Sequence, residues 1–295
     1  DRRIINLETA VTCNDRYWRD KSVHYRMHPE NARLLSTAGL DACTLANNHV
    51  LDWGYDGLAD TLDALQGAGV STAGAGESLT AAQAPVVLPS AGKGRVIVIA
   101  MGSGSSGVPA AWAAGPERAG IWRIDEGADR AVAAVAEQVE GIKGDSDVVV
   151  ASIHWGGNWG YAIPAEQRRF AHTLIDDAGV DLVHGHSSHH PKGMEVYRHR
   201  LVLYGCGDFL NDYEGIPGEE GYRPELTLMY FPELAPDTGR LTGLAMRPMR
   251  IHRFQTIDAD AEEAGWLMDR LNREGEALGT RFTMDDDRTI RLTLS

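Results

Sequence analysis

A run of four histidines at the end of an apolar stretch limits what this chain can fold into. His184, His186, His189 and His190 fall within seven residues, directly after the apolar segment 180–183. The segment is typical of a buried strand, and a strand that stops at imidazoles places them at one edge of a sheet. In an α/β protein such an edge is where a metal site is usually built. The alternative is a polar loop that is merely rich in histidine.

Three other apolar segments also end in groups that bind metals or move protons. They supply, in chain order, Asn6 and Glu8, then Asn47, Asn48, His49 and Asp52, and finally His154. One such segment is a weak signal. Four of them predict a common sheet edge that carries one site assembled from separated parts of the chain.

The composition is that of an ordinary globular chain and excludes several functions. Its 295 residues, 43% of them hydrophobic, are enough for one α/β domain with a large core. The net charge of −14 argues against nucleic acid and anionic membrane surfaces as partners, because both attract basic patches. No apolar run approaches the ~18 residues that a membrane span needs.

The spacing of the cysteines and the N-terminal sequence indicate the cellular compartment. Cys13, Cys43 and Cys206 form no CxxC pair and no even disulfide framework, which favours a reducing compartment. No signal peptide is visible, so we expect a cytoplasmic protein. However, the chain enters a strand almost at once after Asp1, which indicates that upstream residues are missing. The sequence leaves the oligomeric state open.

Strand and helix patterns alternate through the first two-thirds of the chain. Helices are predicted over 29–38, 56–68, 128–142 and 165–178, and strands over 2–7, 40–46, 70–74, 85–88, 95–101, 148–153 and 180–183. The glycine-rich segment 102–107 is predicted to be a flexible loop near the site. A hairpin over 194–205, strands over 226–231 and 241–251, a helix near 259–274 and a strand near 288–294 complete the chain. This order favours a single domain, 1–295, with a two-layer or sandwiched sheet flanked by helices.

The strand-end residues together suit a transition metal. Imidazole, amide and carboxylate ligands favour Mn²⁺, Fe²⁺ or Zn²⁺ over Ca²⁺ or Mg²⁺. The candidate ligands of one or two such ions are Glu8, Asn48, His154, His186 and His189. A metal held there lowers the pKa of bound water and polarises an ester or amide oxygen.

Beside that metal, His49 is the candidate proton donor for a leaving group, and Asp52 would hold its ring in one tautomer. Each role has an alternative: His49 as a polar residue at the start of a helix, and Asp52 as a turn cap. The polar residues expected behind the ligands or against a substrate are Asn6, Asn47, His184 and His190.

These motifs, in this order, resemble those of the CapA or PgsA family of capsule and poly-γ-glutamate synthesis proteins. They are Asn6-Leu-Glu8, Ala46-Asn-Asn-His49 with Asp52 and Gly54, His154-Trp155, Gly185-His186 with His189, and Leu203-Tyr-Gly-Cys-Gly-Asp-Phe209. The resemblance covers about residues 1–250 and places the chain in the calcineurin-like metallophosphatase superfamily. It implies a four-layer α/β/β/α sandwich with a metal site at the strand ends. It also implies that Asn48 and the later histidines are ligands and that His49 is catalytic.

Three features depart from the pattern of that family. The family begins with a Gly-Asp motif that nothing before Asn6 provides, so we expect the motif upstream of Asp1 or lost. Ser187 replaces the middle histidine of the family's Gly-His-His-Pro-His, which weakens a two-metal site. Asp208 stands where the family commonly has asparagine, and it either adds a carboxylate to the site or caps a loop.

Two functions fit these observations. The leading hypothesis is a metal-dependent hydrolase of the metallophosphatase type, which acts through metal-activated water on a phosphoester or on a γ-glutamyl or other amide bond. Its substrate would be a small molecule or a short peptide or polymer. The alternative is a non-catalytic accessory protein in the assembly or export of an anionic capsule polymer such as poly-γ-glutamate. The resemblance favours the accessory protein, whereas the net charge and the lack of a membrane span favour the enzyme.

Overall fold

The structure is a computed structural model that describes residues 1–90, 94–127, 129–213, 216 and 218–294. Within these residues the central element is a seven-stranded sheet of order β10-β8-β11-β12-β14-β13, with β7 beside β8. The strands are β7 (Val86–Pro89), β8 (Arg95–Ser103), β10 (Arg123–Ile124), β11 (Val148–His154), β12 (Leu182–His186), β13 (Met194–Tyr197) and β14 (Arg200–Leu203). All run parallel except β7 and β13. The parallel strands therefore end at one common edge.

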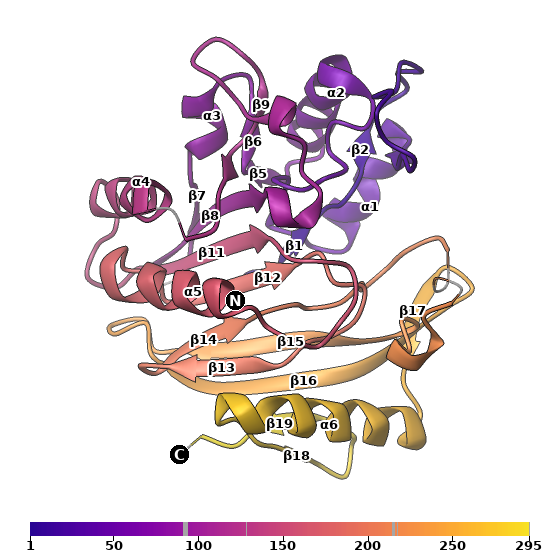
Figure 1. The fold of residues 1–295 in the computed structure, drawn as a ribbon, viewed down its shortest axis with the longest axis vertical. Helices are drawn as coiled ribbons and strands as arrows, with labels where there is room; N and C mark the ends of the chain where they lie inside the picture. The colour runs from indigo at the N-terminus through magenta and orange to yellow at the C-terminus, as the bar shows by residue number, and fades with distance from the viewer. Residues whose placement is uncertain (91–93, 128, 214–215, 217, 295) are drawn as a thin grey trace.

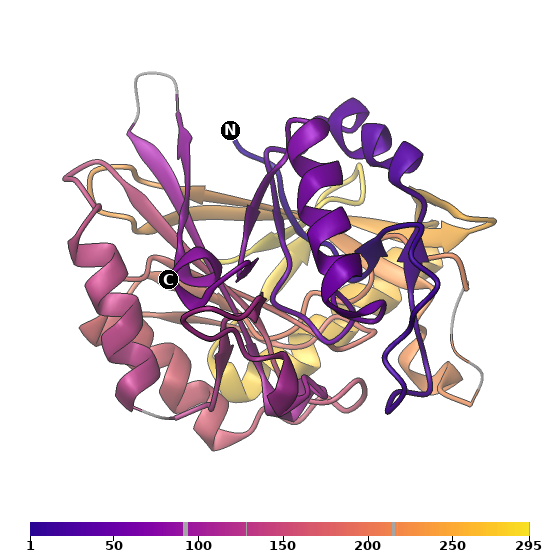
Figure 2. The same cartoon turned by 90° about the horizontal axis from the view of Figure 1, so that it is seen from above.

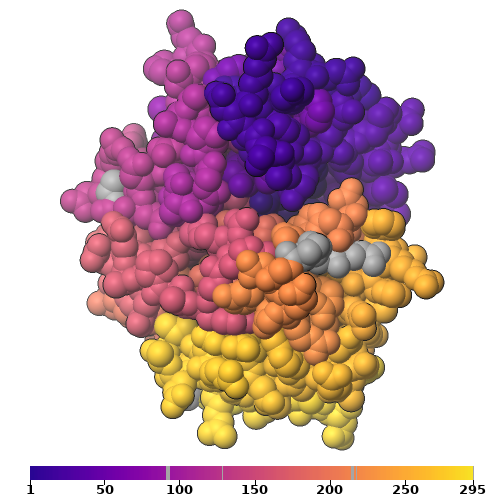
Figure 3. All heavy atoms as spheres, turned by 45° about the vertical axis from the view of Figure 1, so that its right-hand side comes forward, coloured from indigo at the N-terminus to yellow at the C-terminus, as the bar shows by residue number. Residues whose placement is uncertain are grey.

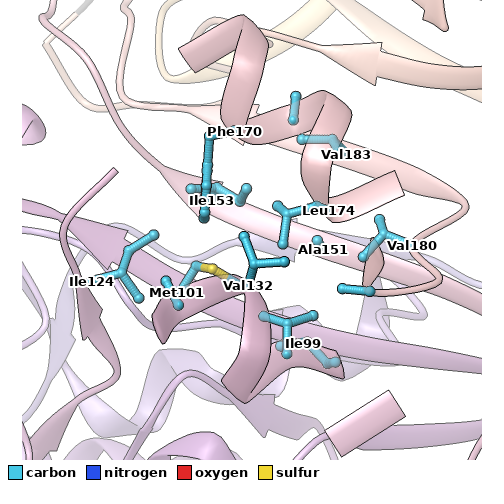
Figure 4. Close-up of a cluster of buried hydrophobic side chains, with 14 of the residues drawn as sticks. Ile99, Met101, Ile124, Val132, Ala151, Ile153, Phe170, Leu174, Val180 and Val183 are labelled. Carbon is cyan, nitrogen blue, oxygen red and sulfur yellow. The ribbon is translucent and has the colours of Figure 1, made fainter. Parts of the chain in front are cut away.

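The residues of β11 show how this sheet is covered. Ala151 and Ile153 are buried in one cluster with Phe170 of α5 (Ala165–Asp177) and with α4 (Asp129–Glu140) (Figure 4). Val150 belongs to a different cluster, on the opposite face. Because alternate residues of a strand point to opposite faces, His154 lies on the same face as Val150 and away from the two helices.

Two further sheets pack against that second face. A parallel sheet contains β1 (Ile4–Asn6), β4 (Ala42–Thr44) and β5 (Ser71–Ala73). An antiparallel sheet contains β15 (Leu226–Leu234), β16 (Leu241–His252), β17 (Gln255–Asp258), β18 (Phe282–Met284) and β19 (Ile290–Leu292). Ala42 of the first packs on Val98 of β8, and Leu228 of the second shares a cluster with Val150.

Helices cover the outer sides of these sheets. Leu58 and Leu65 of α2 (Gly54–Gly67) are buried with Cys43 of β4, beside α1 (Ala32–Thr37). Leu267 of α6 (Ala261–Gly275) packs on the antiparallel sheet. The layers are therefore helix, sheet, sheet and helix, as the resemblance implied (Figures 1 and 2). The shorter elements are β2 (Ala10–Val11), β3 (Arg26–Met27), β6 (Ala75–Gly76), α3 (Leu79–Gln83) and β9 (Gly120–Ile121). In the described part of the chain no helix is long and apolar enough to cross a bilayer.

One predicted loop is wrong in part. The segment 102–107 begins inside β8, which continues to Ser103, and goes on as a 3-10 helix over Gly104–Ser106. The hydroxyl of Ser106 donates to the carbonyl of His154 at 2.9 Å. The glycine content suggested a free loop, whereas this hydroxyl ties the segment to the neighbouring strand.

Candidate metal and acid–base site

Strand register brings the predicted imidazoles together. His154 pairs with Gly102 of β8 on one side and with His186 of β12 on the other. The Nδ1 atoms of His154 and His186 are 2.8 Å apart, and both rings are buried. At position 102 a Cβ atom would lie 2.5 Å from the carbonyl oxygen of Ala46. Glycine there allows the segment that carries Asn48 to approach the sheet.

The second ring nitrogen of His154 faces the N-terminal sheet. Its Nε2 lies 3.1 Å from Oδ1 of Asn48 and 3.6 Å from Oε1 of Glu8. Asn47 donates to Oδ1 of Asn6 at 3.0 Å, and Asn6 donates to Oε2 of Glu8 at 3.1 Å. Asn6 and Asn47 thus hold Glu8 in place behind the contact with His154.

His49 and Asp52 form a buried pair beside Asn48. The distance from Nδ1 of His49 to Oδ2 of Asp52 is 2.6 Å, and Asp52 has no exposed surface. The ring of Tyr25 stacks on His49 at 4.0 Å, and its backbone N–H donates to Asp52 at 2.7 Å. Burial lowers the pKa of His49; the nearby Asp52 opposes that decrease and the charge of Lys21 adds to it. The contacts with Asp52 and Tyr25 fix the orientation of the imidazole.

His189 forms a second pair, with Asp208. Its Nδ1 lies 3.1 and 3.0 Å from the two carboxylate oxygens, and Asp208 also accepts from the hydroxyl of Tyr213 at 2.6 Å. Burial disfavours the charged ring, but the hydrogen bond and charge of Asp208 outweigh it and raise the pKa of His189. The rings of Tyr213 and Tyr25 are stacked 6.1 Å apart, so the loops that carry them meet. Figure 3 shows the N-terminal segment and the segment after β14, in indigo and orange, side by side on one face.

Ser152 links the histidines of β12 to the N-terminal sheet. Its hydroxyl lies 3.0 Å from Nδ1 of His184, 2.9 Å from Nε2 of His186 and 3.0 Å from the hydroxyl of Thr44. Burial lowers the pKa of His184 to about 4 and the pKa of His186 well below its ordinary value. His184 therefore supports His186 through Ser152.

His190 points into an aromatic cluster. Its Nδ1 lies 3.1 Å from the carbonyl oxygen of Pro191, and its ring packs against Trp159, Tyr161 and Tyr222 at 6.0, 4.5 and 4.7 Å. The ring has no exposed surface. Trp159 also contacts His189 at 5.3 Å, so this cluster lies next to the Asp208 pair.

Burial favours the neutral forms of the ionisable side chains at the centre of the site. Burial, and then the negative charge of Asp208, raise the pKa of Glu8 to about 8. Burial, and then the neighbouring cations, lower the pKa of His154 to about 3. A neutral imidazole is the form that binds a metal, and a divalent cation would restore the charge of the carboxylate.

The candidate ligands are of the types that bind a divalent ion, but their positions suit one ion only in part. In the part of the chain that the structure describes, no three His, Cys, Asp or Glu side chains are grouped so that they could hold an ion. His154 turns one ring nitrogen to His186 and the other to Asn48 and Glu8. An ion at Nε2 of His154 would reach Asn48 and Glu8, and His186 would have to serve another ion.

Several residues of the site were not predicted. Lys21 and Tyr25 come from the irregular segment 12–25, and Ser152 lies inside an apolar strand. The Nζ of Lys21 is 2.5 Å from Oδ1 of Asp52 and 3.4 Å from Nδ1 of His49. The only available signal was the alternation of β11, which places Ser152 on the face of His154.

Comparison with known proteins identifies the family. Residues 1–213 match the family model described as bacterial capsule synthesis protein PGA_cap. The chain belongs to this family. A probable polyglutamine synthesis accessory protein of Mycobacterium tuberculosis is 44% identical over 290 residues, which are 98% of this chain and 76% of the relative. The match confirms the resemblance drawn from the spaced motifs.

Two relatives from Bacillus are more distant. The capsule biosynthesis protein CapA of Bacillus anthracis is 29% identical over 210 residues, which are 70% of this chain and 49% of the relative. The PGA biosynthesis protein CapA of Bacillus subtilis is 28% identical over 208 residues, which are 70% of this chain and 52% of the relative. This chain therefore spans about half the length of these two proteins.

Proposed function

We propose that this chain is an accessory protein in the synthesis of a polyglutamate capsule polymer. The observation that carries the proposal is the 44% identity, over 98% of the chain, with a protein named as an accessory for polyglutamine synthesis. The family match over residues 1–213 contains every candidate site residue. The working site in this role is the cluster around His154.

The proposal is tested in the bacterium that encodes the chain. Deletion of its gene should abolish or strongly reduce surface polyglutamate, and the wild-type gene should restore it. Glu8→Gln and His154→Ala should fail to restore the polymer, because they remove the centre of the site. The matched control is His252→Ala, which removes an exposed imidazole of β16. Polymer levels that do not respond to the deletion would contradict the proposal.

A second candidate is metal-dependent hydrolysis, which the pair of His49 and Asp52 beside Asn48 favours. Glu8, Asn48 and His154 would hold a divalent ion of the Mn, Fe or Zn type, which supplies Lewis-acid polarisation of an ester or amide oxygen. His49, held through Nδ1 by Asp52, would act in its protonated form and give the proton on Nε2 to the leaving group.

This activity is tested with purified protein, Mn²⁺, Fe²⁺ or Zn²⁺, and a panel of phosphoesters and γ-glutamyl peptides. If one substrate is hydrolysed, His49→Ala should lower turnover by ~10²–10⁴-fold and retain the metal, as expected for a proton donor. Loss of metal from that variant would make His49 a ligand. If the metal-loaded protein hydrolyses none of the panel, the hydrolase candidate is wrong and only the accessory role remains.

A further inference from the structure

A hollow outside the site lies between two short segments, 14–18 and 53–56. Its volume is about 270 Å³, just below the ~300–1,000 Å³ of typical ligand pockets, so it has room for one small unit. Four of its lining residues are aromatic, namely Tyr17, Trp18, Trp53 and Tyr55. Such a concentration of rings around one hollow is typical of a ligand site.

Three of the four rings are held in place by hydrogen bonds or by ring packing. The indole N–H of Trp53 donates to the carbonyl of Tyr25 at 2.9 Å, and the hydroxyl of Tyr55 donates to the carbonyl of Ala111 at 3.0 Å. Trp18 lies edge-on to Tyr55 at 6.0 Å. The aromatic wall is therefore formed before any ligand arrives, which reduces the ordering cost of binding.

Two of these rings are open to solvent. Tyr17 is 56% exposed and Tyr55 is 37% exposed. Single exposed apolar residues are normal on a protein surface, but neighbouring ones around a concave surface mark a binding site.

The charges at the lip of the hollow are already paired. Arg16 forms an ion pair with Asp56. Arg26 pairs with Asp15 at 2.9 Å and lies over the ring of Trp53 at 4.2 Å. Arg16 and Asp56 line the hollow and their charges cancel, so the lining attracts neither an anionic polymer nor a cation. This favours a neutral ligand.

We propose that this hollow binds a neutral saccharide unit. The apolar face of a sugar ring stacks on an aromatic ring, and its hydroxyls both donate and accept hydrogen bonds. Asn14 donates to the carbonyl of Trp53 and accepts from the backbone N–H of Arg16, and its second N–H and second lone pair, together with the Arg16–Asp56 pair, can serve as both kinds of partner. The backbone N–H of Trp18 donates to the carbonyl of Asp52 at 2.8 Å, so the hollow adjoins the His49 pair. The proposal does not depend on the proposed function.

The test is an NMR titration of the full chain with methyl glucoside, N-acetylglucosamine and cellobiose. The indole N–H signals of Trp18 and Trp53 should shift saturably with one of these sugars. Tyr17→Ala should weaken that binding about threefold to tenfold, the usual worth of an aromatic contact, and Tyr17→Phe should retain it. The matched control is Phe231→Ala, which removes another exposed ring, from β15.

Two charged probes separate the alternatives. A short γ-linked glutamate oligomer represents an anionic polymer, and choline represents a cation. The proposal is wrong if no sugar shifts the indole signals at up to about 100 mM, a concentration that detects even very weak binding. It is equally wrong if Tyr17→Ala and Phe231→Ala change the sugar affinity alike. Should Tyr17→Ala fail to fold, Tyr55→Leu replaces it with the same expected loss.

Discussion

The ammonium group of Lys21 lies 2.5 Å from Oδ1 of Asp52, although the two residues belong to different segments. The side chain of Lys21 is only 14% exposed and that of Asp52 is fully buried. Lys21 also donates to the carbonyl of Asn48 and lies 5.0 Å from the centre of the Trp112 ring. One lysine thus fastens the segment 12–25 to the turn that carries His49.

Lys21→Met should lower the free energy of unfolding by about 3 kcal/mol, because it leaves the buried carboxylate of Asp52 without its cation. Urea unfolding followed by circular dichroism measures this. The control is Arg16→Met, which breaks a pair with side chains 80% and 64% exposed and should cost less than about 1 kcal/mol. Equal losses in the two variants would show that Lys21 does not anchor the segment.

The two ring nitrogens of His154 have different neighbours, which predicts different metal affinities for two variants. Glu8→Gln should weaken binding of Mn²⁺ or Zn²⁺ at least about tenfold, because a charged donor beside Nε2 becomes neutral. His186→Ala should have a smaller effect on the same ion, since it faces Nδ1. Calorimetric titration with the metal alone gives both values. A larger loss in His186→Ala would place the ion between the two histidines.

Asp208→Asn should lower the pKa of His189, because burial would no longer be opposed by a carboxylate. It should also destabilise the fold by about 1–3 kcal/mol, the cost of weakening a buried polar network. NMR titration of the imidazole signals measures the pKa, and the exposed Asp212→Asn is the control. If the pKa of His189 is the same in the variant and the wild type, Asp208 serves only the loop.

The sequence placed one strand end within one residue and another within three. The apolar run 148–153 stops beside His154, where β11 ends, and the run 180–183 stops three residues before His186, where β12 ends. Because neighbouring parallel strands end together, both histidines were expected at one edge. The sandwich itself came from the resemblance to a family. Spacing alone left open how many sheets there are, because β17 is short and mostly polar and β18 has only three residues.

The sequence did not reveal the parts of the site that depend on long-range packing. Lys21 and Tyr25 lie in a segment without periodicity, and only the fold brings them to Asp52. Which nitrogen of His154 faces which neighbour depends on the register of β11 between β8 and β12. No local pattern in the sequence encodes that choice.

Gly102→Ala should destabilise the protein by about 1–3 kcal/mol, because the new Cβ would collide with the backbone carbonyl of Ala46. It should also push Asn48 away from His154 and weaken metal binding. The control is Gly265→Ala, inside α6, where a Cβ has no heavy atom within 4 Å. That variant should gain about 0.4–1 kcal/mol from higher helix propensity. Thermal unfolding compares the two, and a neutral Gly102→Ala would contradict the close approach.

At the opposite end of the sheet, Asp147 makes stability depend on pH. Its carboxylate accepts from the guanidinium of Arg95, and from the backbone N–H groups of Arg95 at 2.9 Å and Gly144 at 2.8 Å. The bond to the Arg95 side chain is the main reason that the pKa of Asp147 is about 2, below its ordinary value of 3.8. A lowered pKa stabilises the folded state fully above the ordinary value, and that contribution is lost as the pH falls through about 2.

Asp147→Asn should therefore be less stable than the wild type at about pH 6, and the difference should shrink as the pH approaches about 2. Urea unfolding across this range measures it, with the exposed Asp145→Asn as the control. If the difference in the free energy of unfolding stays constant with pH, the variant loses stability through altered packing rather than through the lost charge. Asp147 and Arg95 lie at the amino ends of β11 and β8, away from His154, so this measurement reports on the sheet without disturbing the site.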